Sequence, residues 1–262
     1  MKVIIAGSLA YDRIMNFSQN FSDHILPEKI HNLNVAFEVD GVTENFGGTA
    51  GNIVYALNLM GESATLSATI GSDHHQYFDW LEKNGISRDG IRIIPDELTA
   101  GAYITTDKSN NQITGFNPGA MKHSSNLDFS KLDPKNTLLL VSPGNLIDMI
   151  EYPRQCRKKS IPYIFDPGQS LPMLNGDDLK EVISGCTILI VNDYEFNMIL
   201  KKTGLGEKEL LSLAGTTIIT YGGEGSEIFA EQGSTRIPTF SPDRRSTPPE
   251  QETPTGAALS AV

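Results

Sequence analysis

The chain is poor in cysteine and contains no long apolar run. Cys156 and Cys186 are too few for a disulfide framework and lack the spacing of metal ligands, so we expect both to be buried thiols. The five histidines form neither an H-x-x-H nor an H-E-x-x-H pattern. No apolar run is long enough to span a bilayer and no signal-peptide layout opens the chain, which predicts a cytoplasmic protein without a membrane partner.

Basic residues are also in short supply. The chain has 21 Lys and Arg against 32 Asp and Glu, which gives a formal net charge of -11. Binding of nucleic acid needs clusters of Lys and Arg that this sequence lacks, so we expect no nucleic-acid partner. The 262 residues, 39% of them hydrophobic, predict one large globular domain with an ample core.

Short β-rich runs alternate with segments of helical periodicity. Several of these runs are almost continuously apolar, as in parallel strands that are covered on both faces. The alternation predicts an α/β fold with a mostly parallel sheet and helices on both sides. The expected strands are residues 2–7, 64–70, 137–142, 161–165, 187–192 and 216–220. The expected helices are residues 52–60, 75–84, 146–159, 178–184 and 194–203.

Two stretches break this rhythm with a period of two. Residues 32–40 alternate between polar and apolar, and residues 100–106 and 112–116 read as a hairpin through the polar turn 108–111. Period-two strands inserted into an α/β chain predict a small sheet at the rim of the domain. We expect it to form a lid over a substrate site or the contact of a homodimer; decoration of the scaffold is the alternative.

Two acids and a glycine-rich turn are candidates for ligand contacts. Gly47 and Gly48 let the backbone approach a ligand closely at the start of a helix, and Asn52 offers both a donor and an acceptor to sugar hydroxyls. Such turns are common in α/β proteins, so this motif alone does not decide. Asp12 follows the first strand, at the edge where open α/β sheets bind ligands, although an Asx turn would also explain it. Asp166 follows another apolar strand and either shapes the site or makes a turn.

Polar residues and glycines also follow two later strands. Asn192 ends one of these strands, and Glu195 lies in the first turn of the next helix, where an acid also complements the helix dipole. Gly222 and Gly225 follow the strand that ends at Thr220. Two glycines at this spacing suit either contact with phosphates or a simple hairpin turn.

The last part of the sequence has an unusual property. Residues 246–262 show no apolar period, capping pattern or motif with a mechanism. If the reading frame is shifted back by one nucleotide, each new codon takes one largely free base from the preceding codon. Residues 246–256 can then encode Val-Asp-Pro-Thr-Gly-Ala-Gly-Asp-Ala-Tyr-Arg. Because only one base of each new codon is largely free, chance does not easily produce a string of this length that matches a known motif. We therefore expect a frame change near residue 246.

Together and in this order, the motifs resemble the PfkB, or ribokinase-like, family of kinases. The glycine turn resembles the family's sugar-binding signature, and the string hidden in the other frame resembles its catalytic loop. The resemblance implies a ribokinase-like domain over residues 1–240, with lid strands within about 13–46 and 98–118, and an aberrant tail at 241–262. It implies ATP as the phosphoryl donor and Mg²⁺ held by Glu195 through water. The implied substrate-binding residues are Asp12, Gly47, Gly48, Asn52 and Phe116, and the implied nucleotide-binding residues are Asn192, Glu195, Thr220, Gly222 and Gly225.

Within the family, the chain looks most like bacterial adenosine-kinase-type members. The resemblance implies transfer of the ATP γ-phosphate to the ribose 5′-hydroxyl of a nucleoside, with adenosine as the expected substrate. Phe37, Phe46 or Phe116 would stack on the base from the lid. The alternatives are a kinase for a free sugar such as ribose or fructose, and a non-catalytic remnant that binds a sugar or nucleoside.

The printed sequence lacks the residue that the family uses for catalysis. In the resembled family the Asp of Gly-Ala-Gly-Asp is the base for the accepting hydroxyl, and the amides before it form an anion hole. The chain has Glu250-Gln251-Glu252-Thr253 at that place. We therefore assign no catalytic residue and expect little or no turnover. The family's closing helices would also be missing, which predicts exposed apolar surface.

Overall fold

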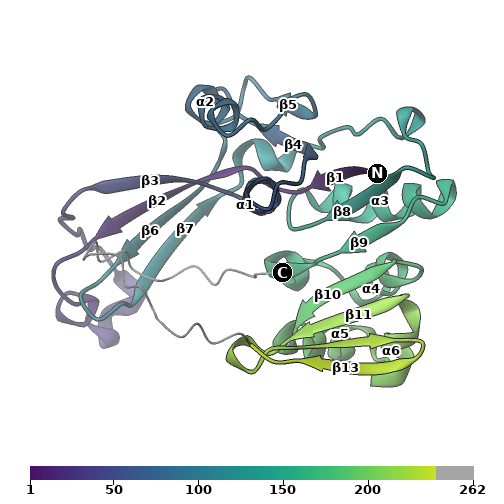
Figure 1. The fold of residues 1–262 in the computed structure, drawn as a ribbon. Coiled ribbons are helices and arrows are strands. Elements are labelled where there is room, and N and C mark those ends of the chain that lie inside the picture. Colours follow the sequence, from purple (N-terminus) through teal and green to yellow (C-terminus); the bar gives the residue numbers. More distant parts are fainter. Residues whose placement is uncertain (240–262) are drawn as a thin grey trace.

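The computed structural model describes residues 1–239, so the expected frame change and the tail lie outside the described residues. A layered domain carries an arm of four strands that projects to one side (Figure 1). The prediction of an α/β fold with a mostly parallel sheet and a small additional sheet is confirmed. No helix in the described part is long and apolar enough to cross a membrane. Both cysteines are buried and unpaired, as expected.

The main sheet has nine strands. In sheet order they are β13 (Gly233–Ile237), β12 (Ser226–Ala230), β11 (Thr216–Thr220), β10 (Ile188–Asn192), β9 (Tyr163–Phe165), β8 (Thr137–Val141), β1 (Lys2–Ala6), β4 (Ala64–Ile70) and β5 (Ile91–Ile93). The strands from β11 to β5 are parallel, and β12 and β13 add an antiparallel edge. Parallel pairing brings the carboxyl ends of seven strands to one edge of the sheet, where the site residues are expected.

Helices cover both faces of this sheet. They are α1 (Thr49–Leu59), α2 (His75–Lys83), α3 (Leu146–Lys159), α4 (Gly176–Ile183), α5 (Asp193–Thr203) and α6 (Glu207–Leu213). Short 3₁₀ turns are η1 (Phe21–Asp23), η2 (Pro27–Asn32), η3 (Gly119–Lys122), η4 (Phe129–Lys131), η5 (Gly168–Met173) and η6 (Gly222–Glu224). The larger core joins α3, α4, α5 and α6 to one face, and the smaller core joins α1 and α2 to the other.

The second face is unevenly covered among the described residues. Leu189 of β10 is fully buried on the side of α5, whereas Ile188 and Ile190 on the opposite side are only partly buried. In register across the sheet, Ile188 lies beside Ile164, and Ile190 lies beside Ile218. The helices of this face lie at its other end, where α1 contacts β1 and β4. An apolar strip over β9, β10 and β11 therefore lacks a helix from the described part of the chain.

The lid sheet is the four-stranded arm, in the order β3 (Val42–Gly47), β2 (Ala10–Asn16), β6 (Ala100–Thr106) and β7 (Gln112–Asn117). The predicted hairpin of β6 and β7 is present. The predicted strand at residues 32–40 is wrong, because no strand pairing occurs at 33–41. Its alternation reflects packing instead: the ring of Phe37 lies 4.8 Å from that of Phe17 and 5.0 Å from that of Phe21. The strand beside β2 comes later in the chain, as β3.

Candidate functional site

The order of the strands reverses between β1 and β8. From β1 the chain runs outward to β4 and β5, then returns to β8 on the other side of β1 and continues to β11. Open α/β sheets bind ligands at such a switch point, outside the carboxyl ends of the strands. Gly7 and Gly144 follow these ends, and a Cβ atom on Gly144 would lie 3.0 Å from the Cα of Gly7. The two backbones therefore pack directly against each other at the switch point.

The glycine turn is fixed to this crossing. Gly48 has a φ of 88°, and a Cβ atom there would lie 2.5 Å from the carbonyl oxygen of Ser8, so only glycine fits. Thr49 begins α1, and its Oγ1 donates to the Pro143 carbonyl at 2.6 Å. The Thr49 amide donates to Ser8 Oγ at 3.0 Å. These contacts hold the N-terminus of α1 against the ends of both β1 and β8.

Asp12 reaches the same turn from the lid sheet. The prediction that Asp12 follows the first strand at the edge of the main sheet is wrong, because it lies within β2, paired with Asn45 of β3. A Cβ atom on Gly47 would clash with the Asp12 carboxylate, so this carboxylate packs against the glycine turn. Burial raises the pKa of Asp12 above its ordinary value. A carboxylate beside two glycines can accept hydrogen bonds from a pair of sugar hydroxyls.

One row of lid residues shares a face with Asp12. Asn45 lies opposite Asp12 on one side and Ala102 on the other, and Phe116 lies opposite Ala102. Residues paired in this way project from the same face of a sheet. Phe116 is 53% exposed, which leaves its ring free to contact a flat ligand. Asn52 is also exposed, one turn into α1 after the glycines.

The other two aromatic candidates pack against other aromatic rings. Phe46 is paired with Tyr11 and therefore lies on the opposite face of the lid sheet from Asp12. Its ring stacks on Trp80 at 5.2 Å. Phe37 belongs to the aromatic cluster at the lid tip. Phe46 therefore does not share a face with Asp12, and stacking of Phe37 or Phe46 on a base stays a prediction.

The expected nucleotide residues lie at the carboxyl ends of β10 and β11. Asn192 and Thr220 are paired in parallel register at the last position of each strand. Asn192 Oδ1 accepts from the Glu195 amide at 2.7 Å, and Glu195 Oε2 accepts from the Asn192 amide at 2.9 Å. This capping box at the start of α5 explains the pairing of Asn192 with Glu195 without any ligand. The sequence pattern alone had not suggested that explanation.

Gly222 and Gly225 form the turn between β11 and β12. Their φ angles are 56° and 94°, in the region that favours glycine. A Cβ atom on Gly225 would clash with the carbonyl of Ile237. The turn itself therefore requires these glycines, and their contact with phosphates stays a prediction.

Asp166 adds a carboxyl group one strand away from Asn192. It follows β9, and its amide donates to the Val141 carbonyl at 2.9 Å. Burial, and then the negative charge of Glu195, raise the pKa of Asp166 to about 7. No cluster of three or more His, Cys, Asp or Glu side chains within residues 1–239 could cage a metal ion. A cation here would be held by one or two carboxylates, water and ligand phosphates, a donor set that fits Mg²⁺.

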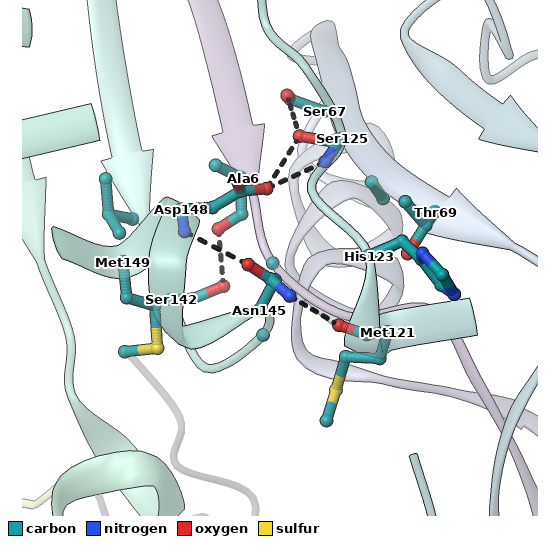
Figure 2. Close-up of a pocket in the computed structure, with 14 residues that line it drawn as sticks. Ala6, Ser67, Thr69, Met121, His123, Ser125, Ser142, Asn145, Asp148 and Met149 are labelled. Atoms are coloured by element: carbon teal, nitrogen blue, oxygen red, sulfur yellow. Dashed lines mark hydrogen bonds between the residues drawn. The ribbon is translucent and has the colours of Figure 1, made fainter. Parts of the chain in front are cut away.

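A small cavity lies between the ends of β1, β4 and β8 (Figure 2). Its volume is about 10 Å³, room for roughly one water molecule. Its polar lining is already bonded: Asn145 Nδ2 donates to the Met121 carbonyl at 3.0 Å, and Asp148 Oδ2 accepts from the Ser125 amide at 2.8 Å. This cavity is too small for a sugar or a nucleoside.

Sequence reasoning missed the residues that tie the lid sheet to the main domain. The Tyr77 hydroxyl donates to the Gly47 carbonyl at 2.7 Å, and the Tyr11 hydroxyl donates to the Asp73 carbonyl at 3.0 Å. Asp73 Oδ1 accepts from the Thr99 amide at 2.8 Å. The segment that begins α2 therefore contacts the roots of β2, β3 and β6. The one sequence signal is Gly51, a third glycine in the same stretch as Gly47 and Gly48, to which the sequence analysis gives no role.

Comparison with known proteins places the chain among kinases. A model of the pfkB family carbohydrate kinases matches residues 9–246. Nucleoside kinase from Burkholderia thailandensis in complex with inosine is 38% identical, with a TM-score of 0.80 over 92% of this chain and 76% of that chain. In complex with ADP-inosine, the same enzyme is 40% identical, with a TM-score of 0.76 over 92% of this chain and 76% of that chain.

Two more distant relatives are also kinases. A nucleoside kinase from Methanocaldococcus jannaschii is 28% identical over 90% of this chain and 75% of its own length. Ribokinase from Thermotoga maritima is 20% identical, with a TM-score of 0.75 over 93% of this chain and 79% of that chain, and so shares the fold. The resemblance inferred from the motifs is confirmed by a family match that covers most of the sequence. The chain therefore belongs to the pfkB family of carbohydrate kinases.

Proposed function

We propose that this fold serves ATP-dependent transfer of the γ-phosphoryl group to the ribose 5′-hydroxyl of a nucleoside. The observation that carries the proposal is the likeness to an inosine-bound nucleoside kinase over 92% of the chain. The described residues supply the matching parts: a lid sheet, a glycine turn at the switch point, and polar groups along the carboxyl edge of the main sheet.

Asp12 and the glycine turn form the substrate end of the proposed site. The Asp12 carboxylate accepts hydrogen bonds from the ribose hydroxyls, and the glycines at 47 and 48 let the backbone come close to the sugar. Asn52 contributes a further donor and acceptor from α1. Phe116, exposed on the same lid face as Asp12, contacts the base.

The nucleotide end lies across β9, β10 and β11. Thr220, Gly222 and Gly225 border the phosphates of ATP, with the strand ends beneath them. Glu195 and Asp166 present oxygen atoms at the same edge, which suits Mg²⁺ held through water. The cation would neutralise charge on the phosphates. Closure of the lid sheet over the sugar would exclude water from the transferring group.

In this proposal, the protein with the sequence as given binds the substrate but catalyses phosphoryl transfer slowly. A general base contributes about 10²–10⁴ in rate, and one anion-hole donor about 10²–10³, and the two effects need not multiply. In the resembled family both features belong to Gly-Ala-Gly-Asp, a string that the other reading frame can encode. One observation supports a frame change: the family match ends at residue 246, where the shifted reading begins.

The lid sheet also provides the surface for the proposed homodimer. Strands β3 and β7 are its two edges, and every residue of β7 is exposed. Ile113 and Phe116 add apolar side chains to that strand. An exposed edge strand is a template for pairing with a second chain. Light scattering at two protein concentrations tests this: a mass of two chains supports the dimer, and a mass of one chain contradicts it.

Titration calorimetry of the printed chain tests the substrate assignment. Inosine, adenosine and ribose are compared at the same pH. We expect inosine or adenosine to bind, with adenosine as the preferred ligand predicted from the sequence, and ribose to bind at least tenfold more weakly. Tighter binding of ribose would favour the free-sugar alternative, and no binding of any of the three would contradict the proposal.

A further inference from the structure

Tyr77 is fully buried at the start of α2, and its hydroxyl makes one hydrogen bond to the glycine turn. The hydroxyl donates to the Gly47 carbonyl at 2.7 Å, and the side chain is 0% exposed. Burial raises the pKa of Tyr77 well above its usual range. The hydroxyl therefore keeps its proton and stays a donor to that carbonyl.

Gly51 has a role that depends on this hydroxyl. It lies in the first turn of α1, where a Cβ atom would clash with the Tyr77 hydroxyl oxygen. Glycine is less favourable than alanine inside a helix, so the helix alone does not explain it. The third glycine of the motif thus leaves the space through which the hydroxyl reaches Gly47.

The hydrogen bond fixes the plane of the peptide that joins Gly47 to Gly48. No cis peptide bond occurs in the described part of the chain. In a trans peptide the carbonyl and the following amide point in opposite directions. Because the Gly47 carbonyl is held toward Tyr77, the Gly48 N–H points away from Tyr77. The hydrogen bond from Tyr77 adds to the pairing of Gly47 with Ala10 in holding this peptide plane, in a stretch where glycine would otherwise allow rotation.

The same segment holds the strand that carries Asp12. The Tyr77 amide donates to the Tyr11 hydroxyl at 3.2 Å, and that hydroxyl donates to the Asp73 carbonyl at 3.0 Å. Tyr11 immediately precedes Asp12 in β2. The Asp12 carboxylate and the glycine peptide therefore take their positions from one rigid turn.

We propose that Tyr77 is a positioning residue for the ribose diol. It orients the peptide of Gly47 so that the Gly48 amide and the Asp12 carboxylate bind the 2′- and 3′-hydroxyls together. This inference rests on the proposed nucleoside-binding function and deepens it. Tyr77 touches no substrate and acts only through the glycine turn.

The test compares Tyr77→Phe with Tyr55→Phe in the full chain. Tyr55 belongs to the same aromatic cluster, with its ring 5.2 Å from Trp80, but its hydroxyl has no hydrogen-bond partner within residues 1–239. Titrations use inosine and 2′,3′-dideoxyinosine, which lacks the diol. Loss of one positioning hydrogen bond is expected to weaken inosine about 3- to 10-fold in Tyr77→Phe, with dideoxyinosine changed by less than about twofold. Tyr55→Phe should alter neither ligand.

Equal losses for both ligands in Tyr77→Phe, or unchanged inosine affinity, would overturn the positioning role. If Tyr77→Phe does not fold, Gly51→Ala tests the same claim, because its methyl group displaces the same hydroxyl. The same loss of selectivity is then expected, and its absence would count against the role. Failure of the unsubstituted chain to bind inosine would instead overturn the proposed function, and this inference with it.

Discussion

Replacement of Gly48 by alanine separates two costs that the fold imposes on the glycine turn. Gly48 has a φ of 88°, and a Cβ atom there would lie 2.5 Å from the Ser8 carbonyl oxygen and 2.7 Å from the Ala10 amide nitrogen. Gly61 is a matched control, because its φ is 81° and a Cβ atom there would meet nothing within 4 Å. The two positions share a positive φ, whereas Gly48 adds the steric conflict and a ψ of 144°, a combination that is far less accessible to alanine than the left-handed helical region.

The expected magnitudes follow from these contacts. A left-handed non-glycine residue costs about 1 kcal/mol, so Gly61→Ala should lower the unfolding free energy by about that amount. Overpacking against backbone that cannot move costs roughly another 1–3 kcal/mol, so Gly48→Ala should lose about 2–4 kcal/mol. For a domain of this size, 1 kcal/mol corresponds to about 2–4 °C in Tm.

Urea unfolding followed by circular dichroism measures both variants, with calorimetry for inosine binding. We expect Gly48→Ala to be the less stable and to lose inosine affinity, and Gly61→Ala to bind inosine like the unsubstituted chain. Equal stability of the two variants would refute the claim that the α1 turn is packed against β1. Unchanged inosine affinity in Gly48→Ala would remove this turn from the site.

Three further substitutions test single residues. Asp12→Asn should weaken inosine about 10- to 100-fold yet raise Tm slightly, since burial raises the pKa of Asp12 and so disfavours its charge; unchanged affinity would exclude Asp12 from the site. The pKa of Asp166 is raised from 3.8 to about 7, so between these pH values the native chain holds a proton that the unfolded chain has lost. The free energy of unfolding should therefore fall by about 1–2 kcal/mol from pH 5 to pH 8, once the partial exposure of Asp166 is allowed for. Urea midpoints should show a flatter profile in Asp166→Asn, and equal slopes would contradict this origin. Glu195→Ala opens the capping box and should cost about 1 kcal/mol in the same assay, and no loss would mean that the cap contributes nothing.

The sequence predicted the buried parts of the fold well. The strand at 64–70, the strand at 216–220 and the helix at 146–159 agree with the structure at both ends. In each of these elements, the local pattern of apolar residues predicts which side chains are buried. Gly61, Gly85 and Gly204, which follow the ends of α1, α2 and α5, all have positive φ angles, as is common where a helix ends.

The lid strands were harder to predict because one of their faces packs against protein and the other faces solvent or a ligand. The resemblance implied lid strands within about 13–46, but the residues alone did not assign β2 and β3, since both strands mix polar and apolar residues and face solvent or ligand on one side. The alternation at residues 32–40 came from packing of Phe37 in an aromatic cluster, not from strand pairing. Asp12 was placed at the wrong sheet for the same reason: its strand belongs to the lid, which no local period reveals.

At the candidate site, the sequence motifs predicted the family but not the roles of single residues. Their order identified the family, and register places Asn192 beside Thr220 as a parallel sheet requires. The roles of single residues did not follow, because Asn192 and Glu195 satisfy a helix cap and Gly222 satisfies a turn. Contacts between distant segments, such as that of Tyr77 with Gly47, leave no periodic mark in the sequence.

The most direct test of the central claim is phosphoryl transfer from ATP to inosine by two chains. One is the printed chain; in the other the frame is shifted back by one nucleotide after Arg245 and read to the next stop codon. We expect the restored chain to form inosine 5′-monophosphate and the printed chain to bind inosine but react at least about 10²-fold more slowly. Equal rates for both chains, or no transfer by the restored chain, would contradict the account.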